Sequence, residues 1–475
     1  MFSLLLACAS IPVALAAPAK TSNITSTQDS FDYVIVGGGL AGLTLPMVAG
    51  KTLGGSGSIN GASWTKEPKT RYDLLPLLTG DMSWGWDGLN QYMLGAEHFH
   101  TPSNYLKSKG ANHDGDKHGY SGPVQVSFAQ GMFGSIQQPA LNASQQIWGL
   151  GHVDDAVSGI VNGVTTISNM IRWSNTCTDA EPECVLSADG IHYQAFRNSE
   201  RLFVKATREV LLATGSMQSP QLLELSGVGD PAILNKANVP VQKSLKGVGK
   251  NLQEQTKNTI TYIPKSEDLE GSGPSSAIAI PNTLASLASY AADLEAQGLI
   301  VNATATHEIL KYQVANLFNQ SEAAAEIFFT LASKTDSAPA TVGADLWNLP
   351  SYFNHPLDLR LQTLATKQAA QVYSTAPLAD MVERRVFPAS ELESYEAWEA
   401  FVKDTFISAW HPITTLSMMK AEMGGVVDNR LKVYGLANVR AVDASVLPVQ
   451  LSAHLSSSLY GVAEKAAVMI EEDQN

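Results

Sequence analysis

The distribution of apolar and polar residues along the chain predicts several strands. A short β-branched run, Asp32 to Val36, is apolar enough for a strand that is buried on both faces of a parallel sheet. The segment Arg201 to Thr214 alternates and then becomes apolar, which predicts a hairpin that enters a buried strand. Pro123 to Phe128 and Asn438 to Val446 also predict strands, and the second of these ends at Asp443.

The last segment of the chain predicts a helix with one apolar face, made by Leu459, Val462, Ala463, Ala466, Met469 and Ile470. Ser456 or Ser457 is the expected N-cap of this helix. An Ala/Leu-rich stretch from Asn282 to Lys334 predicts surface helices that polar turns interrupt. Ser83 to Asp87 and His113 to Gly122 are expected to be loops.

The N-terminal segment from Met1 to Ala17 has the pattern of a secretory signal peptide. Its apolar stretch is shorter than the ~20 residues that span a bilayer, and it ends in the small-x-small sequence Ala14-Leu15-Ala16. The alternative is a buried N-terminal helix. N-x-S/T sequons are present at Asn23, Asn142, Asn302 and Asn319. We therefore expect residues 1–17 to be a signal peptide and the protein to be a glycoprotein that is secreted or enters the secretory pathway.

The composition narrows the class of protein further. The chain has 475 residues and a formal net charge of −14, a field that repels nucleic acid and anionic lipid surfaces. Of three cysteines, Cys8 belongs to the leader, and Cys177 and Cys184 either pair or remain free thiols. No His lies near these two cysteines in their loop, so no metal site is expected.

A glycine-rich turn follows the first predicted strand and has the spacing of a dinucleotide-binding loop. Gly37-Gly38-Gly39-Leu40-Ala41-Gly42 is a G-x-G-x-x-G sequence. The first glycine allows a tight turn, the second lets the main chain approach a pyrophosphate, and the third lets the following helix pack on the strand. The N-terminus of that helix would face the phosphates.

The expected continuation of this motif is missing. A dinucleotide-binding unit continues with a full helix and a second strand, and ends in an acid about 20 residues on that binds the ribose. Here Pro46 and Gly50 follow almost at once, and the first acid afterwards, Glu67, lies in a predicted loop. The sequence therefore offers no evident acid for the ribose.

Four segments in order resemble the glucose-methanol-choline (GMC) family of FAD-dependent oxidoreductases, in its branch with glucose oxidase and aryl-alcohol oxidase. They are DYVIVGGGLAGL, LGGSGSINGASWTK from Leu53 to Lys66, GSMQSPQLLELSGVG from Gly215 to Gly229, and the region from Trp410 to the end. Relative to the family pattern, residues are missing between Ala49 and Lys51 and around Asn169 to Phe196.

The resemblance implies an α/β fold (α+β overall): a Rossmann-like FAD-binding domain with an interleaved substrate domain of antiparallel sheet plus helices. The FAD-binding domain would be discontinuous, with residues 31–66, 198–255 and 424–475. Residues 67–197 and 256–423 would form the substrate-binding lobe and connecting loops.

The resemblance also assigns a site. His411 would be the catalytic base and His454 its partner on the substrate oxygen, because a neutral imidazole is suited to take a hydroxyl proton. The segment Leu53 to Lys66 resembles the family's flavin-edge loop, and because it contains no His, FAD would bind non-covalently. The residues expected to contact it are Gly37, Gly39, Leu40, Ala41, Gly42, Gly55, Ser56, Asn60, Gly61, Ala62, Ser63, Asp443, Ala444 and Leu455.

The implied function is hydride removal from an alcohol CH–OH group of a sugar, aryl alcohol or secondary metabolite. The expected partners are this small-molecule alcohol and O2 or a quinone as acceptor, with no nucleic acid and no membrane; a homodimer is an open alternative. Two other hypotheses remain. One is a flavin-binding relative that performs a non-redox cyclisation, and the other is an inactive truncated isoform.

Overall fold

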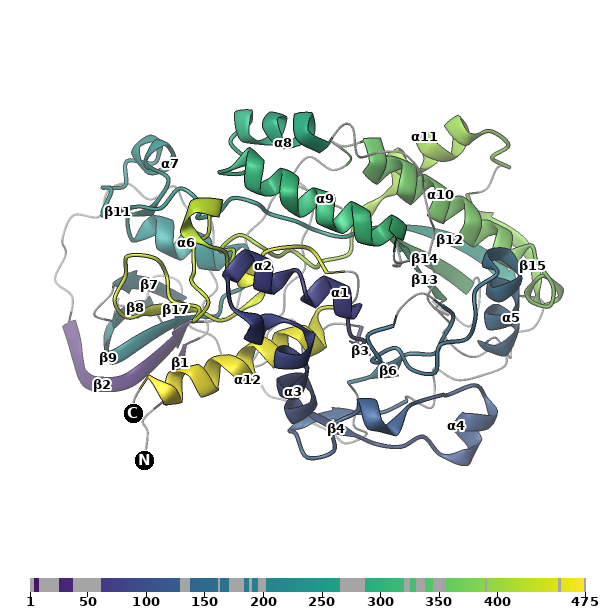
Figure 1. Cartoon of the computed structure of the whole chain (residues 1–475), viewed down its shortest axis with the longest axis horizontal. Helices are drawn as coiled ribbons and strands as arrows, with labels where there is room; N and C mark the ends of the chain where they lie inside the picture. Colours follow the sequence, from purple (N-terminus) through teal and green to yellow (C-terminus); the bar gives the residue numbers. More distant parts are fainter. Residues whose placement is uncertain are drawn as a thin grey trace.

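The computed structural model describes most of the chain in segments. These are residues 4–7, 25–36, 61–128, 137–160, 163–170, 183–187, 190–194, 202–264, 287–319, 325–329, 338–344, 353, 356–388, 391–451 and 454–473. Figure 1 shows a sheet at each end of the molecule, with helices over and between the two sheets.

The first sheet has a parallel core of three strands. β2 (Thr25–Val36) pairs with β9 (Leu202–Leu212), and β9 pairs on its other side with β17 (Val439–Ala441). The register places Val36 and Ala441 on either side of Leu212, so the carboxyl ends of the three strands meet at one edge.

Shorter strands extend this sheet on both sides. β8 (Gly190–Gln194) runs antiparallel to the first residues of β9, and β7 (Glu183–Ser187) pairs with β8. β1 (Leu4–Ala7) lies parallel to β2. The structure therefore places two strands of residues 67–197, which the sequence assigns to the substrate lobe, in the first sheet. The leader hypothesis for residues 1–17 stays a prediction.

The second sheet is antiparallel and belongs to the other end of the molecule. Its order is β13 (Ala325–Phe329), β14 (Ala338–Ala344), β12 (Thr256–Pro264) and β15 (Val382–Phe387), and β16 (Ile407–Ser408) also pairs with β12. The helices on this side of the molecule are α5 (Gln137–Trp148), which packs on α10, together with α8 (Leu287–Ala296), α9 (Ala303–Asn319), α10 (Pro356–Tyr373) and α11 (Tyr395–Thr405). A mixed sheet with a parallel core and a separate antiparallel sheet with helices confirm the predicted fold class.

Other short helices and strands lie between β2 and β12 in the sequence. They are β3 (Ser63–Trp64), α1 (Lys69–Tyr72), α2 (Leu75–Thr79), β4 (Glu97–Phe99), α4 (Asn104–Ser108), β5 (Val124–Val126), β6 (Ser168–Asn169), α6 (Gln218–Leu225), β10 (Val228–Gly229), α7 (Pro231–Lys236) and β11 (Lys243–Ser244).

The last helix, α12 (Ser456–Glu472), packs against α3 (Trp86–Ala96). At their contact a Cβ on Gly461 would lie 2.6 Å from Met93 Cγ, so the glycine allows the close approach. The helix is confirmed, but its N-cap is Leu455 rather than a serine. Ala463, predicted on the apolar face, is exposed, whereas Lys465 is buried.

Three other predictions of local structure are wrong in part. The expected loop Ser83 to Asp87 contains the start of α3, and Gly88 is needed there because a Cβ would lie 2.3 Å from the Ser83 carbonyl oxygen. The hairpin expected within Arg201 to Thr214 is one strand, β9, which pairs with β2 along its length. Its alternating part also pairs with β8, and its apolar part also pairs with β17. The helical stretch Asn282 to Lys334 also contains the strand β13.

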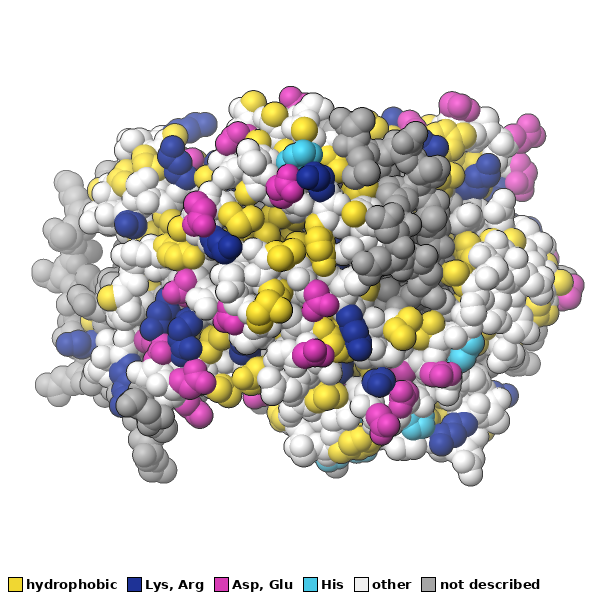
Figure 2. Space-filling view, in the orientation of Figure 1, with side chains coloured by type: hydrophobic (Ala, Val, Ile, Leu, Met, Phe, Trp, Pro, Cys, Tyr) yellow, Lys and Arg dark blue, Asp and Glu magenta, His cyan; other side chains and the backbone are white. Residues whose placement is uncertain are grey.

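The distribution of surface charge and the apolar character of the helices concern the expectation that the protein binds neither nucleic acid nor a membrane. Figure 2 shows basic and acidic side chains interspersed on one face, with no broad area of a single sign. Among the described residues, none of the helices has the combination of length and apolar character that crossing a bilayer requires.

Candidate active site

His411 lies in the loop that follows β16 of the second sheet. Main-chain pairing holds the start of this loop against the residues at the start of β12. Ser408 of β16 pairs with Thr256 of β12, and Ala409 N–H donates to the Gln255 carbonyl at 2.8 Å. Trp410 then adopts a left-handed conformation with φ +62°, which is uncommon for a bulky residue. The main chain therefore turns sharply at Trp410 and presents His411 beyond the edge of the sheet.

Glu254 and Gln255, immediately before β12, both contact His411. Glu254 Oε1 accepts the His411 main-chain N–H at 2.7 Å, and its Oε2 accepts the Ser408 hydroxyl at 3.0 Å. Gln255 Oε1 lies 2.6 Å from His411 Nδ1, and Gln255 Nε2 donates to the Leu451 carbonyl at 2.7 Å. The imidazole and its main chain are thus fixed from the same dipeptide.

Glu254 is almost completely buried, and this changes its acidity. Burial raises its pKa to about 7, and the hydrogen bonds from His411, Ser408 and Gln255 only partly oppose that effect. A carboxyl group that titrates near neutral pH therefore lies directly behind His411. Perturbed carboxyl groups of this kind gather at functional sites.

His454 reaches the same place from the other end of the sequence. Its ring lies 5.5 Å from the ring of His411, centre to centre, at an angle of 87°. Its main-chain N–H donates to Thr65 Oγ1 at 3.1 Å, and Ser457 Oγ donates to the Thr65 carbonyl. Three distant segments therefore converge on one pair of imidazoles.

The positive end of α12 lies next to this pair. The helix begins at Ser456, two residues after His454, and its N-cap Leu455 supplies no side-chain hydrogen bond to the first turn. The N–H groups of a first helical turn carry roughly half a positive charge. This end of α12 can therefore stabilise negative charge beside the imidazoles.

The carboxyl ends of the parallel strands form the other part of the site. After β17, Asp443 accepts hydrogen bonds from Gly215 N–H at 2.9 Å, from Ser219 Oγ at 2.5 Å and from Ser445 N–H at 2.8 Å. Asp443 thus ties the chain after β9 to the chain after β17. Ligands of open α/β sheets bind outside the carboxyl ends of such strands.

Space and an unused polar group are present at this edge. Gly215 has φ +83°, and among the described atoms none lies within 4 Å of a Cβ built on it. The buried hydroxyl of Ser216 has no hydrogen-bond partner among the described groups. An elongated polar ligand that passes Gly215 and accepts or donates at Ser216 would fit here.

The structure places only some of the sequence-predicted contacts. Gly37, Gly39, Leu40, Ala41, Gly42, Gly55, Ser56 and Asn60 lie outside the described residues, as does Cys177. Gly61 is exposed, Ala62 has φ +58°, Ser63 lies in β3, and Leu455 is buried. Sequence reasoning missed Thr65, Glu254 and Gln255, because their partners are remote in sequence and no motif marks them.

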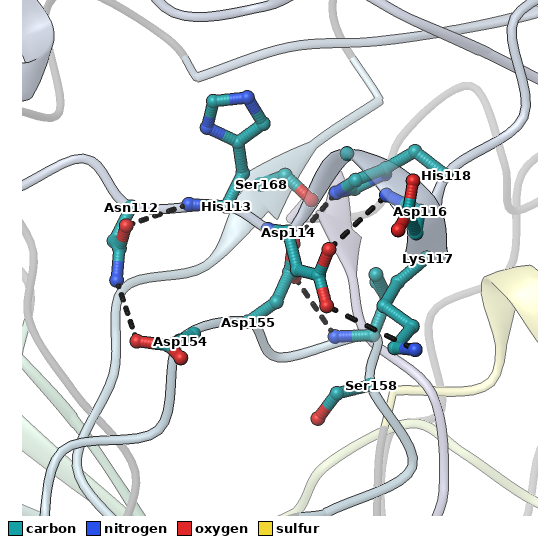
Figure 3. Close-up of polar contacts among 12 residues, drawn as sticks. Asn112, His113, Asp114, Asp116, Lys117, His118, Asp154, Asp155, Ser158 and Ser168 are labelled. Atoms are coloured by element: carbon teal, nitrogen blue, oxygen red, sulfur yellow. Dashed lines mark hydrogen bonds and ion pairs between the residues drawn. The ribbon is translucent and has the colours of Figure 1, made fainter.

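A buried cluster of ionisable side chains, Glu97, His118 and Asp155, lies close to the segment with Thr65, which holds His454. His118 Nδ1 lies 2.6 Å from Glu97 Oε1 and His118 Nε2 lies 2.8 Å from Asp155 Oδ2, and all three side chains are buried. Figure 3 shows His118 and Asp155 with the adjoining loop, from which Asp114 N–H donates to Asp155. Burial alone would lower the pKa of His118, but the hydrogen bonds to both carboxylates raise it overall.

Lys66, the neighbour of Thr65, belongs to the same cluster. Its ammonium donates to Asn90 Oδ1 at 3.0 Å and to the Lys117 carbonyl at 3.1 Å. Burial lowers its pKa to about 8, and the charges of Glu97 and Asp155 partly offset this effect.

Among the described residues, no group of three or more His, Cys, Asp or Glu side chains is placed to hold a metal ion.

Comparison with known proteins adds a family assignment to this geometry. The N-terminal family model for GMC oxidoreductases matches residues 31–147 and 184–257, and the C-terminal model matches residues 340–463. Glucose oxidase 2 of Penicillium expansum is 30% identical over 90% of this chain and 80% of its own length. Glucose oxidase of Penicillium chrysogenum is 29% identical over 91% of this chain and 82% of its own.

Solved structures share the fold at lower identity. An FAD-dependent oxidoreductase from Chaetomium thermophilum superposes with a TM-score of 0.77 at 21% identity, covering 93% of this chain and 95% of that one. A fungal aryl-alcohol oxidase gives a TM-score of 0.73 at 20% identity, with the same coverage. The Penicillium chrysogenum alignment extends over 511 positions, more than this chain contains, so that relative has internal residues without a counterpart here.

Proposed function

The chain belongs to the GMC oxidoreductase family, and from this premise we propose that it is an FAD-dependent oxidoreductase that removes a hydride from an alcohol carbon. The observation that carries the proposal is the pair of imidazoles, His411 and His454, at right angles beside the positive end of α12. Each histidine matches a position at which the family pattern has one.

The described residues fit FAD at the carboxyl edge of the first sheet. The open side of Gly215 and the buried Ser216 hydroxyl would accommodate the ribityl and pyrophosphate portion, next to the Asp443–Ala444 turn. The G-x-G-x-x-G segment from Gly37 to Gly42 would face the pyrophosphate. When bound, FAD supplies the acceptor for the hydride.

His411 is the proposed base. An alcohol is too weak an acid to ionise before reaction, so its hydroxyl proton must leave as the hydride leaves the adjacent carbon. A neutral imidazole with a pKa near 6.5 is suited to take this proton at neutral pH. Glu254 and Gln255 hold His411 in position for that transfer, through its main-chain N–H and its Nδ1.

His454 and α12 have supporting roles in the proposal. His454 would hydrogen-bond the substrate oxygen, and the edge-to-face approach of its ring to that of His411 supports this role. The N–H groups of the first turn of α12 would stabilise negative charge that develops on the ring of the reduced cofactor. These donors need not move during the reaction, because Thr65 fixes the segment from His454 to Ser457.

The substrate class is an alcohol of the sugar or aryl type, or a secondary-metabolite alcohol, with O2 or a quinone as the final acceptor. Two of the most similar relatives are named glucose oxidases, and one structural neighbour is an aryl-alcohol oxidase. Secretion is proposed from the leader at residues 1–17 and the N-x-S/T sequons.

The proposal is tested by purification followed by a visible absorption spectrum and an alcohol screen. A yellow protein that releases FAD on denaturation and turns over an alcohol with O2 or a quinone would support it. A folded protein that binds no flavin would contradict it. Bound flavin with acid–base turnover but no reduction would favour the cyclisation hypothesis instead.

A further inference from the structure

The side chain of Gln255 bridges two fixed groups at the proposed site. Its Nε2 lies 2.7 Å from the carbonyl oxygen of Leu451, three residues before His454. Its Oε1 lies 2.6 Å from Nδ1 of His411. Gln255 therefore connects the two segments that carry the histidines.

These two contacts determine which nitrogen of His411 carries the proton. A main-chain carbonyl oxygen only accepts hydrogen bonds, so the Gln255 atom facing Leu451 must be the amide nitrogen. The atom facing His411 is then the amide oxygen, which also only accepts. Nδ1 of His411 must therefore be the donor, and in the neutral ring the lone pair is on Nε2.

We propose that Gln255 is a positioning residue that holds neutral His411 with its proton on Nδ1, so that Nε2 is the atom that accepts the alcohol proton. The assignment of Nε2 as the base rests on the proposed function, whereas the tautomer itself does not. In the step, the O–H and C–H bonds of the alcohol break, an N–H bond forms on Nε2, and a C=O bond forms as the carbon is oxidised. The hydride would pass to bound FAD, the acceptor in the proposed function.

A neutral amide suits this role better than a carboxylate would. A carboxylate on Nδ1 would stabilise the imidazolium and raise the pKa of His411, so that less of the base would be free at neutral pH. Among the described residues, the charged or titratable groups that face this part of the site include Glu254 behind the His411 main chain, His454 across the site, and Lys257 beside Trp410. The ammonium of Lys257 lies 4.6 Å from the ring centre of Trp410.

Two substitutions separate positioning from a purely structural role. Gln255→Met keeps the length of the side chain and removes the acceptor, and Gln255→Glu keeps an acceptor but makes it anionic. Gln253→Met is the matched control. Gln253 lies two residues earlier in the same segment and is fully buried, whereas Gln255 is partly buried, and the amide of Gln253 contacts Asn251 and the Gln450 N–H rather than His411.

The first readout is independent of activity. In ¹⁵N-histidine-labelled holoenzyme, NMR should show neutral His411 protonated on Nδ1, with the signal assigned by its loss in His411→Asn. Gln255→Met should give a mixture of tautomers, and Gln253→Met should match the wild type. A wild-type His411 protonated on Nε2, or a tautomer unchanged in Gln255→Met, would overturn the proposal.

The second readout is the pH profile of anaerobic flavin reduction by an alcohol. Gln255→Met should lower the limiting rate on the order of 10–100-fold with little change in apparent substrate affinity. Gln255→Glu should restore part of that rate and move the acid limb about one pH unit higher. If the tautomer is as expected but no alcohol reduces the flavin, the positioning holds and the proposed function fails. Unchanged profiles in both variants would overturn the role of Gln255.

Discussion

The main-chain N–H of His454 donates to Thr65 Oγ1 at 3.1 Å, which joins residues 389 positions apart in the sequence. The carbonyl of Thr65 also accepts from Ser457 Oγ in the first turn of α12. One threonine in the predicted flavin-edge loop thus fixes both the second imidazole and the helix end beside it. Its neighbour Lys66 extends into the buried charge cluster around His118.

Thr65→Val should slow flavin reduction while leaving the fold intact. Valine has nearly the volume of threonine but cannot accept the His454 N–H, so the second imidazole loses one of its constraints. We expect a rate about 10-fold lower at saturating alcohol, measured by anaerobic stopped-flow absorbance. Thr65→Ser, which keeps the acceptor, should recover most of the rate; equal losses in both variants would argue against this hydrogen bond.

Glu254→Gln should change how stability depends on pH. Because the pKa of Glu254 is raised from 4.5 to about 7 in the folded protein, the native state holds this proton more tightly than the unfolded state. The stability of the wild type relative to Glu254→Gln should therefore fall as pH rises from about 4.5 to about 7. Thermal midpoints at pH 5 and pH 8 measure the difference. A gap that is constant, or that changes in the opposite direction, would contradict the raised pKa.

His118→Gln should be most destabilising at low pH. The raised pKa of His118 means that its contribution is complete below the unfolded value of 6.5 and is lost as pH rises through the folded value. Removing one partner of a buried ionic cluster costs on the order of 3 kcal/mol. Denaturant unfolding of wild type and variant should show a free-energy gap at pH 6 that narrows by pH 9. His100→Gln, which alters an exposed histidine, is the control and should show no such narrowing.

Asp443→Ala should weaken cofactor retention. Asp443 holds the Gly215 N–H and the Ser219 hydroxyl at the carboxyl edge of the first sheet, so its loss frees the chain that would line the cofactor. We expect FAD to bind about 10-fold more weakly, measured by flavin content after gel filtration and by reconstitution of the apoprotein. Asp428→Ala is a matched control, because Asp428 caps a turn through Arg430 and Lys432 N–H groups. Equal flavin retention in the two variants would count against a role for Asp443.

Sequence reasoning worked where a local pattern determines an element. The β-branched run before Gly37 predicts the end of β2, and the apolar period after Ser456 predicts α12, since both patterns depend only on neighbouring residues. The two histidines were identified from ordered motifs. The structure then places their rings 5.5 Å apart.

The remaining features depend on contacts that no local pattern encodes. α3 begins at Trp86, inside the predicted loop Ser83 to Asp87, and its Gly88 allows the close approach of the Ser83 carbonyl. The His118 cluster takes its carboxylates from Glu97 and Asp155, on segments that only the tertiary fold brings together.

The central claim is most directly tested by mixing the holoenzyme anaerobically with primary and secondary alcohols while the visible flavin absorbance is recorded. The proposed mechanism predicts that at least one alcohol bleaches the flavin, and that His411→Asn slows the bleaching about 10²–10⁴-fold without loss of bound flavin. Bound flavin that stays oxidised with every alcohol, or bleaching at the wild-type rate in His411→Asn, would contradict it.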